Sequence, residues 1–210
     1  QAGCNRILLL SSGAVYGPSF DSTSNFSEDY LSAPDAMDPK SAYAEGKRAS
    51  ELVSVMASSE IGLSVSVARC FAFVGPHLPL DKHFAIGNFI SAAMKNQTIH
   101  IKGDGTPLRS YLYAADMAVW LWTILFSGKN CRAYNVGGSE SVSIRELAQR
   151  VVSSLGSSSD IVIGMPPKIG QAPQKYIPNL GRSTSELGLK VQFDLEMAVY
   201  KTAEFHKEIE

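Results

Sequence analysis

Apolar and polar positions along the chain follow a pattern typical of strands in some stretches and a pattern typical of helices in others. A continuous apolar run at 7–10 is typical of a strand covered on both faces, as in a parallel sheet. The alternating, β-branched stretch LSVSVARCF at 63–71 predicts a second strand. Shorter strands are expected at 98–101, 132–136 and 160–163.

Helical periodicity fills the intervals between the predicted strands. The segment 41–61 sets charged residues against an apolar stripe, with Ser41 as a possible N-cap and Gly62 as the stop. A capping box, Ser143 with Glu146, opens another helix that ends before Gly156. Further helices are expected at 83–96, 110–128, 182–189 and 194–209, and the apolar run within 110–128 predicts a buried core helix. The alternation of strands and helices predicts an α/β fold.

Composition and charge exclude some classes of partner. The chain has 210 residues, of which 45% are apolar and 19% charged, and its net charge is −1. Such a balance gives no electrostatic reason to bind nucleic acid or an anionic membrane surface. No apolar run approaches the ~20 residues that span a bilayer, and no secretory signal is seen. We therefore expect neither nucleic acid nor a membrane as partner.

The cysteines and histidines do not form a recognisable metal-binding pattern. Cys4, Cys70 and Cys131 are scattered and odd in number, which suits a reducing compartment better than a disulfide framework. No CxxC occurs, and the four histidines form no spaced pair. We expect a cytoplasmic protein without a metal site.

A tyrosine and a lysine in the first long helix offer the first candidate chemistry. Tyr43 and Lys47 are four residues apart, which puts them on one helix face about 6 Å apart along the axis. A phenol ordinarily titrates near pH ~10, and a neighbouring ammonium stabilises its ionised form. A serine hydroxyl opposite could then hold the substrate oxygen whose proton the phenol exchanges. Taken alone, this spacing also fits an exposed helix face of no function.

Several motifs occur together in a recognisable order. They are SSGAVYG at 11–17, YAEGK at 43–47, RCFAFVGP at 69–76, GDGTPLRSYLYAADMA at 103–118, YNVGG at 134–138 and YIPNLGRSTSELGL at 176–189. In this order they resemble the extended short-chain dehydrogenases/reductases, and more narrowly the NAD-dependent nucleotide-sugar epimerase/dehydratase family. The resemblance covers nearly the whole chain, from Arg6 to about Lys207.

The resemblance implies a fold and a division of the chain. It implies an incomplete Rossmann-like, doubly wound sheet containing only the later strands, plus a small α/β substrate-binding subdomain. Residues 1–75 would carry the later part of the NAD-binding domain and its catalytic helix. Residues 76–210 would be mainly substrate-binding, with a returning strand and helix near 110–137. The sequence contains no G-x-x-G-x-x-G loop between a first strand and a helix, so we expect this chain alone to bind NAD weakly and to be inactive.

The resemblance also assigns roles to individual residues. Ser12 would be the catalytic hydroxyl, Tyr43 the acid and base, and Lys47 the holder of the nicotinamide ribose. Ser11, with Tyr43 and Lys47, is expected to face NAD. Arg109 would bind the substrate diphosphate, for which a bidentate guanidinium is suited, although a surface salt bridge is the alternative.

Three further positions are expected to bind substrate on the same grounds. They are Ala72, Phe73 and His83. Ala72 stands where many relatives have an asparagine that contacts substrate, so the identity of the sugar stays open. His83 precedes a helix that relatives place over the substrate, and a plain surface position is its alternative.

Two small residues after Ser12 bear on the reaction type. Sugar 4,6-dehydratases carry an Asp-Glu pair at the positions of Gly13 and Ala14, and UDP-glucuronate decarboxylases carry a glutamate there. Because neither residue can transfer a proton, we expect an NAD-dependent nucleotide-sugar epimerase. A 4,6-dehydratase with its acid and base elsewhere, and a non-catalytic binding protein that kept the fold, are the alternatives. The family also implies a homodimer through the helix of Tyr43 and Lys47.

Overall fold

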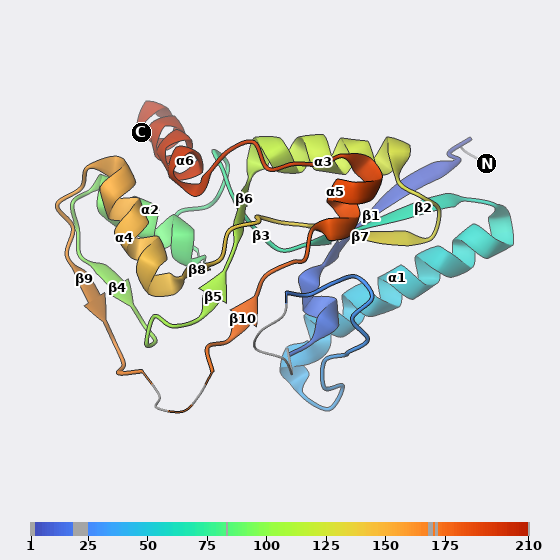
Figure 1. Ribbon diagram of the computed structural model, residues 1–210, viewed down its shortest axis with the longest axis horizontal. Helices are drawn as coiled ribbons and strands as arrows, with labels where there is room; N and C mark the ends of the chain where they lie inside the picture. The colour runs from blue at the N-terminus through green and yellow to red at the C-terminus, as the bar shows by residue number, and fades with distance from the viewer. Residues whose placement is uncertain (1–2, 19–24, 83, 168–169, 171, 210) are drawn as a thin grey trace.

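A parallel sheet forms one half of the molecule (Figure 1). β1 (Arg6–Ser12) pairs with β2 (Ser64–Cys70), and β2 pairs with β7 (Arg132–Val136). Helix α1 (Ala42–Ile61) lies along one face of the sheet and α3 (Ala114–Ser127) along the other. Because helices cover both faces, a strand such as β1 can carry an unbroken apolar run, here at 7–10.

The chain is represented by a computed structural model that describes residues 3–18, 25–82, 84–167, 170 and 172–209. His83 lies outside the described residues. The predicted α/β class is confirmed. α3 and β7 fall in the range 110–137, and the assignment of that range to a returning part of the first domain stays a prediction. The division of the chain at residue 75 stays a prediction.

Most of the remaining elements build the second half, on the left of Figure 1. Helices α2 (Ala85–Met94), α4 (Ile144–Leu155) and α6 (Leu195–Ile209) pack around one apolar core. Short strands border them: β3 (Ala72–Val74) with β6 (Tyr111–Tyr113), β4 (Ile99–Ile101) with β9 (Ile161–Ile163), and β5 (Leu108–Arg109) between β8 (Val142–Ser143) and β10 (Lys175–Tyr176). The helix α5 (Gly181–Leu187) and the 3-10 turns η1 (Gly13–Tyr16) and η2 (Pro39–Ser41) complete the described elements, and these three lie beside the parallel sheet and its helices.

Helix ends follow the local signals with one exception. The capping box of Ser143 and Glu146 is present at α4, and Gly62 ends α1 in the left-handed conformation at φ 69°. Ser41 precedes α1 but its side chain makes no capping bond. The turn η2 runs directly into α1, so the capping side chain lies one turn earlier, where Asp38 accepts from the Lys40 backbone N–H at 3.0 Å.

The apolar helix α3 is only half buried, which corrects the prediction of a fully buried helix. Trp120 and Ile124 are buried against Tyr134 of β7. Trp122 and Phe126, which are 61% and 67% exposed, stack on each other on the opposite side of the helix. Along the described part of the chain, β1 pairs with a strand only on its β2 side, and Leu10 of β1 is half exposed. This end of the sheet therefore carries uncovered apolar surface.

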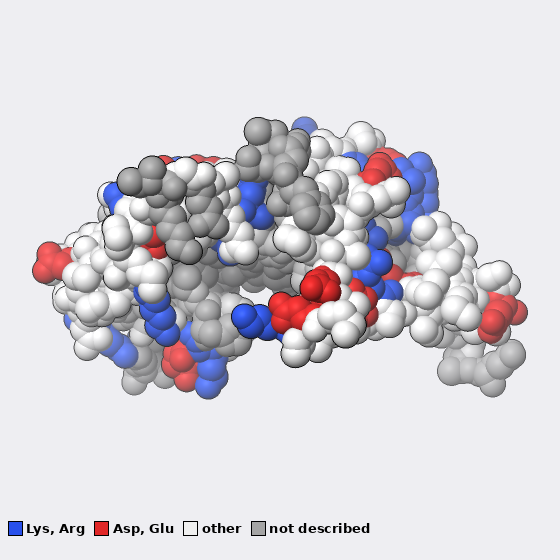
Figure 2. Space-filling model, turned by 90° about the horizontal axis from the view of Figure 1, so that it is seen from below, with Lys and Arg blue, Asp and Glu red and all other residues white. Residues whose placement is uncertain are grey.

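The charged surface is mixed. Figure 2 shows one face of the molecule, on which acidic and basic side chains are interspersed and the surface is hollowed near the middle. Within the described ranges, no helix is both long and apolar enough to cross a bilayer.

One carboxylate fastens α5 to the sheet. Glu186 of α5 accepts hydrogen bonds from Arg132 and Tyr134 of β7, and Lys129 lies 3.3 Å from it. These donors, chiefly the Arg132 guanidinium, lower the pKa of Glu186 to about 2. A folded-state pKa below the ordinary 4.5 means that this carboxylate stabilises the fold above pH 4.5, and that the contribution is lost as the pH falls toward 2.

We predict that Glu186→Gln lowers stability at pH 7 but hardly at pH 2. The free energy of unfolding, measured by urea denaturation from pH 7 to pH 2, should fall more steeply with acid in the parent protein than in the variant. Glu60→Gln, at an exposed position of α1, is the control and should follow the parent curve. Parallel curves for Glu186→Gln and the parent would contradict this role.

Candidate active site

The strand β1 ends in the serine that the sequence singled out. Ser12 is the last residue of β1 and the N-cap of η1, and its Oγ accepts a hydrogen bond from the Ala14 backbone N–H at 3.2 Å. This bond turns the chain sharply at the carboxyl end of the sheet. A largely buried hydroxyl is thereby held at the edge where parallel α/β sheets bind their ligands.

Lys47 joins α1 to β1 beside Tyr43. Its Nζ donates to the Leu10 carbonyl oxygen at 2.8 Å and lies 5.8 Å from the centroid of the Tyr43 ring. The Tyr43 side chain is 61% exposed, so its hydroxyl is open to a ligand. An ammonium has three N–H donors, and only one has a partner among the residues that the structure describes. Lys47 can therefore bind hydroxyl groups of a ligand while it stays attached to β1.

A second tyrosine, which our sequence analysis did not single out, lies at Ser12. The Tyr176 hydroxyl lies beside the turn that follows Ser12, 2.8 Å from the point where a Cβ on Gly13 would be, and its ring centroid lies 4.7 Å from that of Phe71. Tyr43 and Arg109 are both near enough to influence its titration. Burial raises the pKa of Tyr176, so this phenol is neutral at neutral pH. The residue stands in the YIPN motif, but nothing in that motif indicates contact with Ser12.

Arg109 carries a positive charge without an anionic partner. It donates to the Leu108 carbonyl oxygen at 2.8 Å and to Gln174 Oε1 at 3.2 Å, and its Cζ lies 5.8 Å from the centroid of the Tyr176 ring. Burial lowers the pKa of Arg109. No carboxylate pairs with it among the described side chains, so the salt bridge considered as an alternative is not found there. A half-buried cation of this kind suits an anionic ligand.

The other expected binding residues are placed less directly. Phe73 packs against the cluster beneath α3 that contains Trp120, and Ala72 lies beside it in β3. The phenylalanine that touches Tyr176 is Phe71. The Ser11 hydroxyl donates to Glu51 Oε1 at 2.5 Å. Binding roles for Ser11, Ala72, Phe73 and His83 stay predictions.

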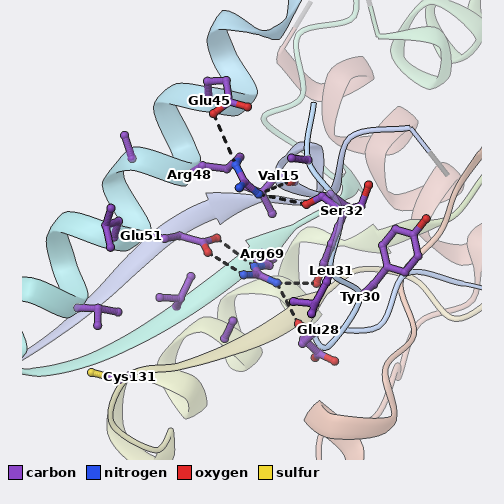
Figure 3. Close-up of a pocket in the computed structure, with 17 residues that line it drawn as sticks. Val15, Glu28, Tyr30, Leu31, Ser32, Glu45, Arg48, Glu51, Arg69 and Cys131 are labelled. Atoms are coloured by element: carbon purple, nitrogen blue, oxygen red, sulfur yellow. Dashed lines mark hydrogen bonds and ion pairs between the residues drawn. The ribbon is translucent and has the colours of Figure 1, made fainter. Parts of the chain in front are cut away.

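A pocket of about 920 Å³ opens on the other flank of α1 (Figure 3). Across it, Arg69 of β2 makes a bidentate ion pair with Glu51 of α1, at 3.0 and 2.7 Å. The same guanidinium donates to the Tyr16 hydroxyl at 3.1 Å and to the Glu28 carbonyl oxygen at 3.3 Å. Burial raises the pKa of Tyr16 to about 12, so Tyr16 stays a neutral hydrogen-bonding group.

Arg48 completes the polar lining of this pocket. It donates to the carbonyl oxygens of Val15 and Ser32 and lies 3.5 Å from the Glu45 carboxylate. None of Ser12, Tyr43, Lys47 and Arg109 lines the pocket. The charged side chains described here are paired with one another or with the backbone. These contacts hold α1 against β1, β2 and the segment after η1.

Metal-binding groups are not gathered anywhere in the described ranges. No three His, Cys, Asp or Glu side chains there lie close enough together to hold an ion. Cys70, which pairs with Ser12 in the sheet register, is largely buried, and this burial raises the pKa of its thiol to about 11. The thiol is therefore not a nucleophile at neutral pH.

Comparison with known protein families and sequences gives a consistent picture. A model described as the NAD dependent epimerase/dehydratase family matches residues 1–137. UDP-glucuronic acid decarboxylase 1 of Danio rerio is 29% identical over 206 residues, which are 98% of this chain and 48% of that protein. UDP-glucuronic acid decarboxylase 6 of Arabidopsis thaliana is 27% identical over 183 residues, 87% of this chain and 52% of that protein. The chain thus spans about half the length of these curated relatives.

Solved structures agree with the fold. UDP-glucose 4-epimerase from Thermotoga maritima, solved with UDP-glucose, superposes with a TM-score of 0.85 at 22% identity over 99% of this chain and 65% of that one. dTDP-glucose 4,6-dehydratase from Streptomyces venezuelae, solved with NAD, gives 0.79 at 25% identity over 99% of this chain and 61% of that one. The family match over residues 1–137 establishes that the chain belongs to the NAD-dependent epimerase/dehydratase family, and the solved structures agree with it in fold.

Proposed function

We propose that the protein is an NAD-dependent epimerase of a nucleoside diphosphate sugar. Support comes from a strand-end hydroxyl (Ser12), a phenol beside an ammonium (Tyr43 and Lys47), and a cation free to bind a diphosphate (Arg109). The relatives named above act on or bind UDP- and dTDP-sugars by their names, which supports this class of substrate.

The chain's own residues suit NAD at one side of the site. When bound, NAD supplies the hydride acceptor and donor of the reaction. The unpartnered N–H groups of Lys47 and the exposed hydroxyl of Tyr43 would hold the nicotinamide ribose, with Ser11 nearby on β1. The low affinity of this chain alone for NAD stays a prediction.

Proton transfer follows from the same arrangement. Ser12 donates a hydrogen bond to the sugar oxygen at the reacting carbon, which orients it. Tyr43 accepts the hydroxyl proton as that carbon becomes a ketone, and returns the proton when the alcohol is restored. The Lys47 ammonium, next to the Tyr43 ring, stabilises the phenolate that accepts this proton and that is restored when the proton is returned. The proton count is therefore unchanged over the full cycle, as an epimerisation requires.

The observation that carries the choice of epimerase concerns Gly13. A Cβ atom at this position would lie 2.7 Å from Phe71 Cζ and 2.8 Å from the Tyr176 hydroxyl. The two aromatic side chains thus fill the space in which a carboxylate at position 13 would have to lie. The Asp-Glu pair of the family's dehydratases would put its first carboxylate at this position, whereas epimerisation needs no carboxylate there.

The 4,6-dehydratase alternative would need an acid and a base from elsewhere. Glu45, the acidic residue between Tyr43 and Lys47, pairs with Arg48 and lines the pocket on the other flank of α1. It is therefore not placed to replace the missing carboxylate.

We also propose a homodimer through α1 and a cytoplasmic location. Leu52, Val53 and Met56 on α1 are 62%, 63% and 50% exposed, which supports an apolar contact between two copies of this helix. The location rests on the composition and the scattered cysteines alone.

The reaction is tested with the full-length protein, NAD and a panel of UDP-glucose, UDP-glucuronate and dTDP-glucose. We predict an isomer of unchanged mass by chromatography and mass spectrometry. Tyr43→Phe should lower the rate by about 10²–10⁴-fold because it removes the acid and base. Tyr200→Phe, half exposed on α6, is the matched control and should retain full activity. A product that has lost water or carbon dioxide would refute the epimerase proposal.

The packing around Gly13 gives a separate prediction on stability. Gly13→Ala should lower the free energy of unfolding by about 1–3 kcal/mol, because Phe71 and Tyr176 must move to admit one methyl group. Gly46→Ala in α1 meets no atom within 4 Å and should raise it by about 0.5–1 kcal/mol. Urea denaturation of the two variants measures both effects. Equal effects of the two substitutions would show that position 13 has room for a side chain.

A further inference from the structure

Tyr176 touches both ends of the candidate site, although it belongs to neither of the segments that carry the catalytic residues. We propose that Tyr176 is a positioning residue whose hydroxyl orients Ser12 and whose ring supports the Arg109 guanidinium. The proposal rests on the proposed function of Ser12 and Arg109, and it adds a link between proton transfer and binding of the diphosphate.

Short-strand pairing brings Tyr176 to this place. β10 runs parallel to β5, with Tyr176 opposite Arg109, and the Leu108 backbone N–H donates to the Gln174 carbonyl oxygen at 2.8 Å. On the following residue, the Ile177 carbonyl oxygen accepts from the Phe26 backbone N–H at 2.9 Å, and the Ile177 side chain is fully buried. The backbone on both sides of Tyr176 is thereby held.

The phenol of Tyr176 packs against the turn that follows Ser12. Its hydroxyl lies 2.8 Å from the point where a Cβ on Gly13 would be, next to Ser12, and its ring contacts the Phe71 ring. The absence of a side chain on Gly13 is what lets the hydroxyl come so close. The same glycine therefore excludes a carboxylate and admits Tyr176.

The hydrogen-bonding capacity of Ser12 shows what this contact does. A serine hydroxyl has one proton to donate and two lone pairs that accept. The Ala14 backbone N–H occupies one lone pair, and the O–H of Tyr176, a neutral phenol, can occupy the other. The Ser12 proton is then left to donate to a ligand, which is the role an oxygen of the sugar requires.

The ring has a second effect at Arg109. The guanidinium carbon lies 5.8 Å from the ring centroid, within the range of a cation–π contact. This contact directs the guanidinium without neutralising it, because the ring carries no net charge. A diphosphate on Arg109 and a sugar oxygen on Ser12 would thus be placed relative to one rigid side chain.

The contact between Ser12 and Tyr176 is tested without any turnover. In this chain labelled with ¹³C at tyrosine Cζ, with the Tyr176 signal assigned through Tyr176→Phe, we expect Ser12→Ala to shift that signal. The Tyr200 signal is the internal control and should not move. An unchanged Tyr176 signal overturns the proposal.

Kinetics of the full-length protein test the functional part. Tyr176→Phe keeps the ring and should lower kcat about tenfold, from loss of one hydrogen bond, with KM for the nucleotide sugar within about twofold. Tyr176→Leu removes the ring as well and should also raise KM. Ser12→Ala with Tyr176→Phe should be no slower than Ser12→Ala alone, because Tyr176 acts through Ser12.

Two results separate this proposal from the proposed function. If the double variant is about tenfold slower than Ser12→Ala, the two losses of rate are independent. That result overturns the positioning role even if the protein is an epimerase. A ¹³C shift without turnover of any sugar supports the link between Ser12 and Tyr176 and overturns the epimerase proposal instead.

Discussion

The attachment of α1 to β1 is the interaction on which the candidate site depends. Glu51 of α1 accepts from the Ser11 hydroxyl and pairs with Arg69 of β2, and both side chains of that ion pair are less than a fifth exposed. Opposite charges that are largely removed from water are costly to separate, because each would be left unpaired in a low dielectric. The rotation of α1 about its axis is therefore set, and with it the direction of Tyr43 and Lys47 from the helix. Lys47 adds a second contact between α1 and β1, because its Nζ donates a hydrogen bond to the Leu10 carbonyl oxygen.

The site is assembled from four segments that are distant in sequence. Ser12 comes from the end of β1, Tyr43 and Lys47 from α1, Arg109 from β5 and Tyr176 from β10. Parallel pairing of β1 with β2 puts the serine at the carboxyl edge of the sheet, and parallel pairing of β5 with β10 sets the arginine beside the second tyrosine. Arg109 and Tyr176 are thereby neighbours without a continuous motif between them.

Gly13 connects packing with the type of reaction. Phe71 and Tyr176 fill the volume beside it, so a side chain at the position after Ser12 would have to displace them. Under the proposed function, this position therefore supplies no acid, which agrees with a reaction that only moves a hydride.

Local signals in the sequence determined the parts of this protein that depend on neighbours along the chain. The apolar run of β1, the capping box of α4 and the shared face of Tyr43 and Lys47 follow from strand and helix periods, which need no knowledge of the rest of the fold. Tertiary structure alone decided that Tyr176 lies beside Ser12 and that Phe71, rather than Phe73, contacts Tyr176. It also decided that one side of α3 is uncovered. A strand of two residues is too short to show an alternation of apolar and polar positions. The partners of a side chain across the sheet depend on long-range packing, which no local pattern encodes.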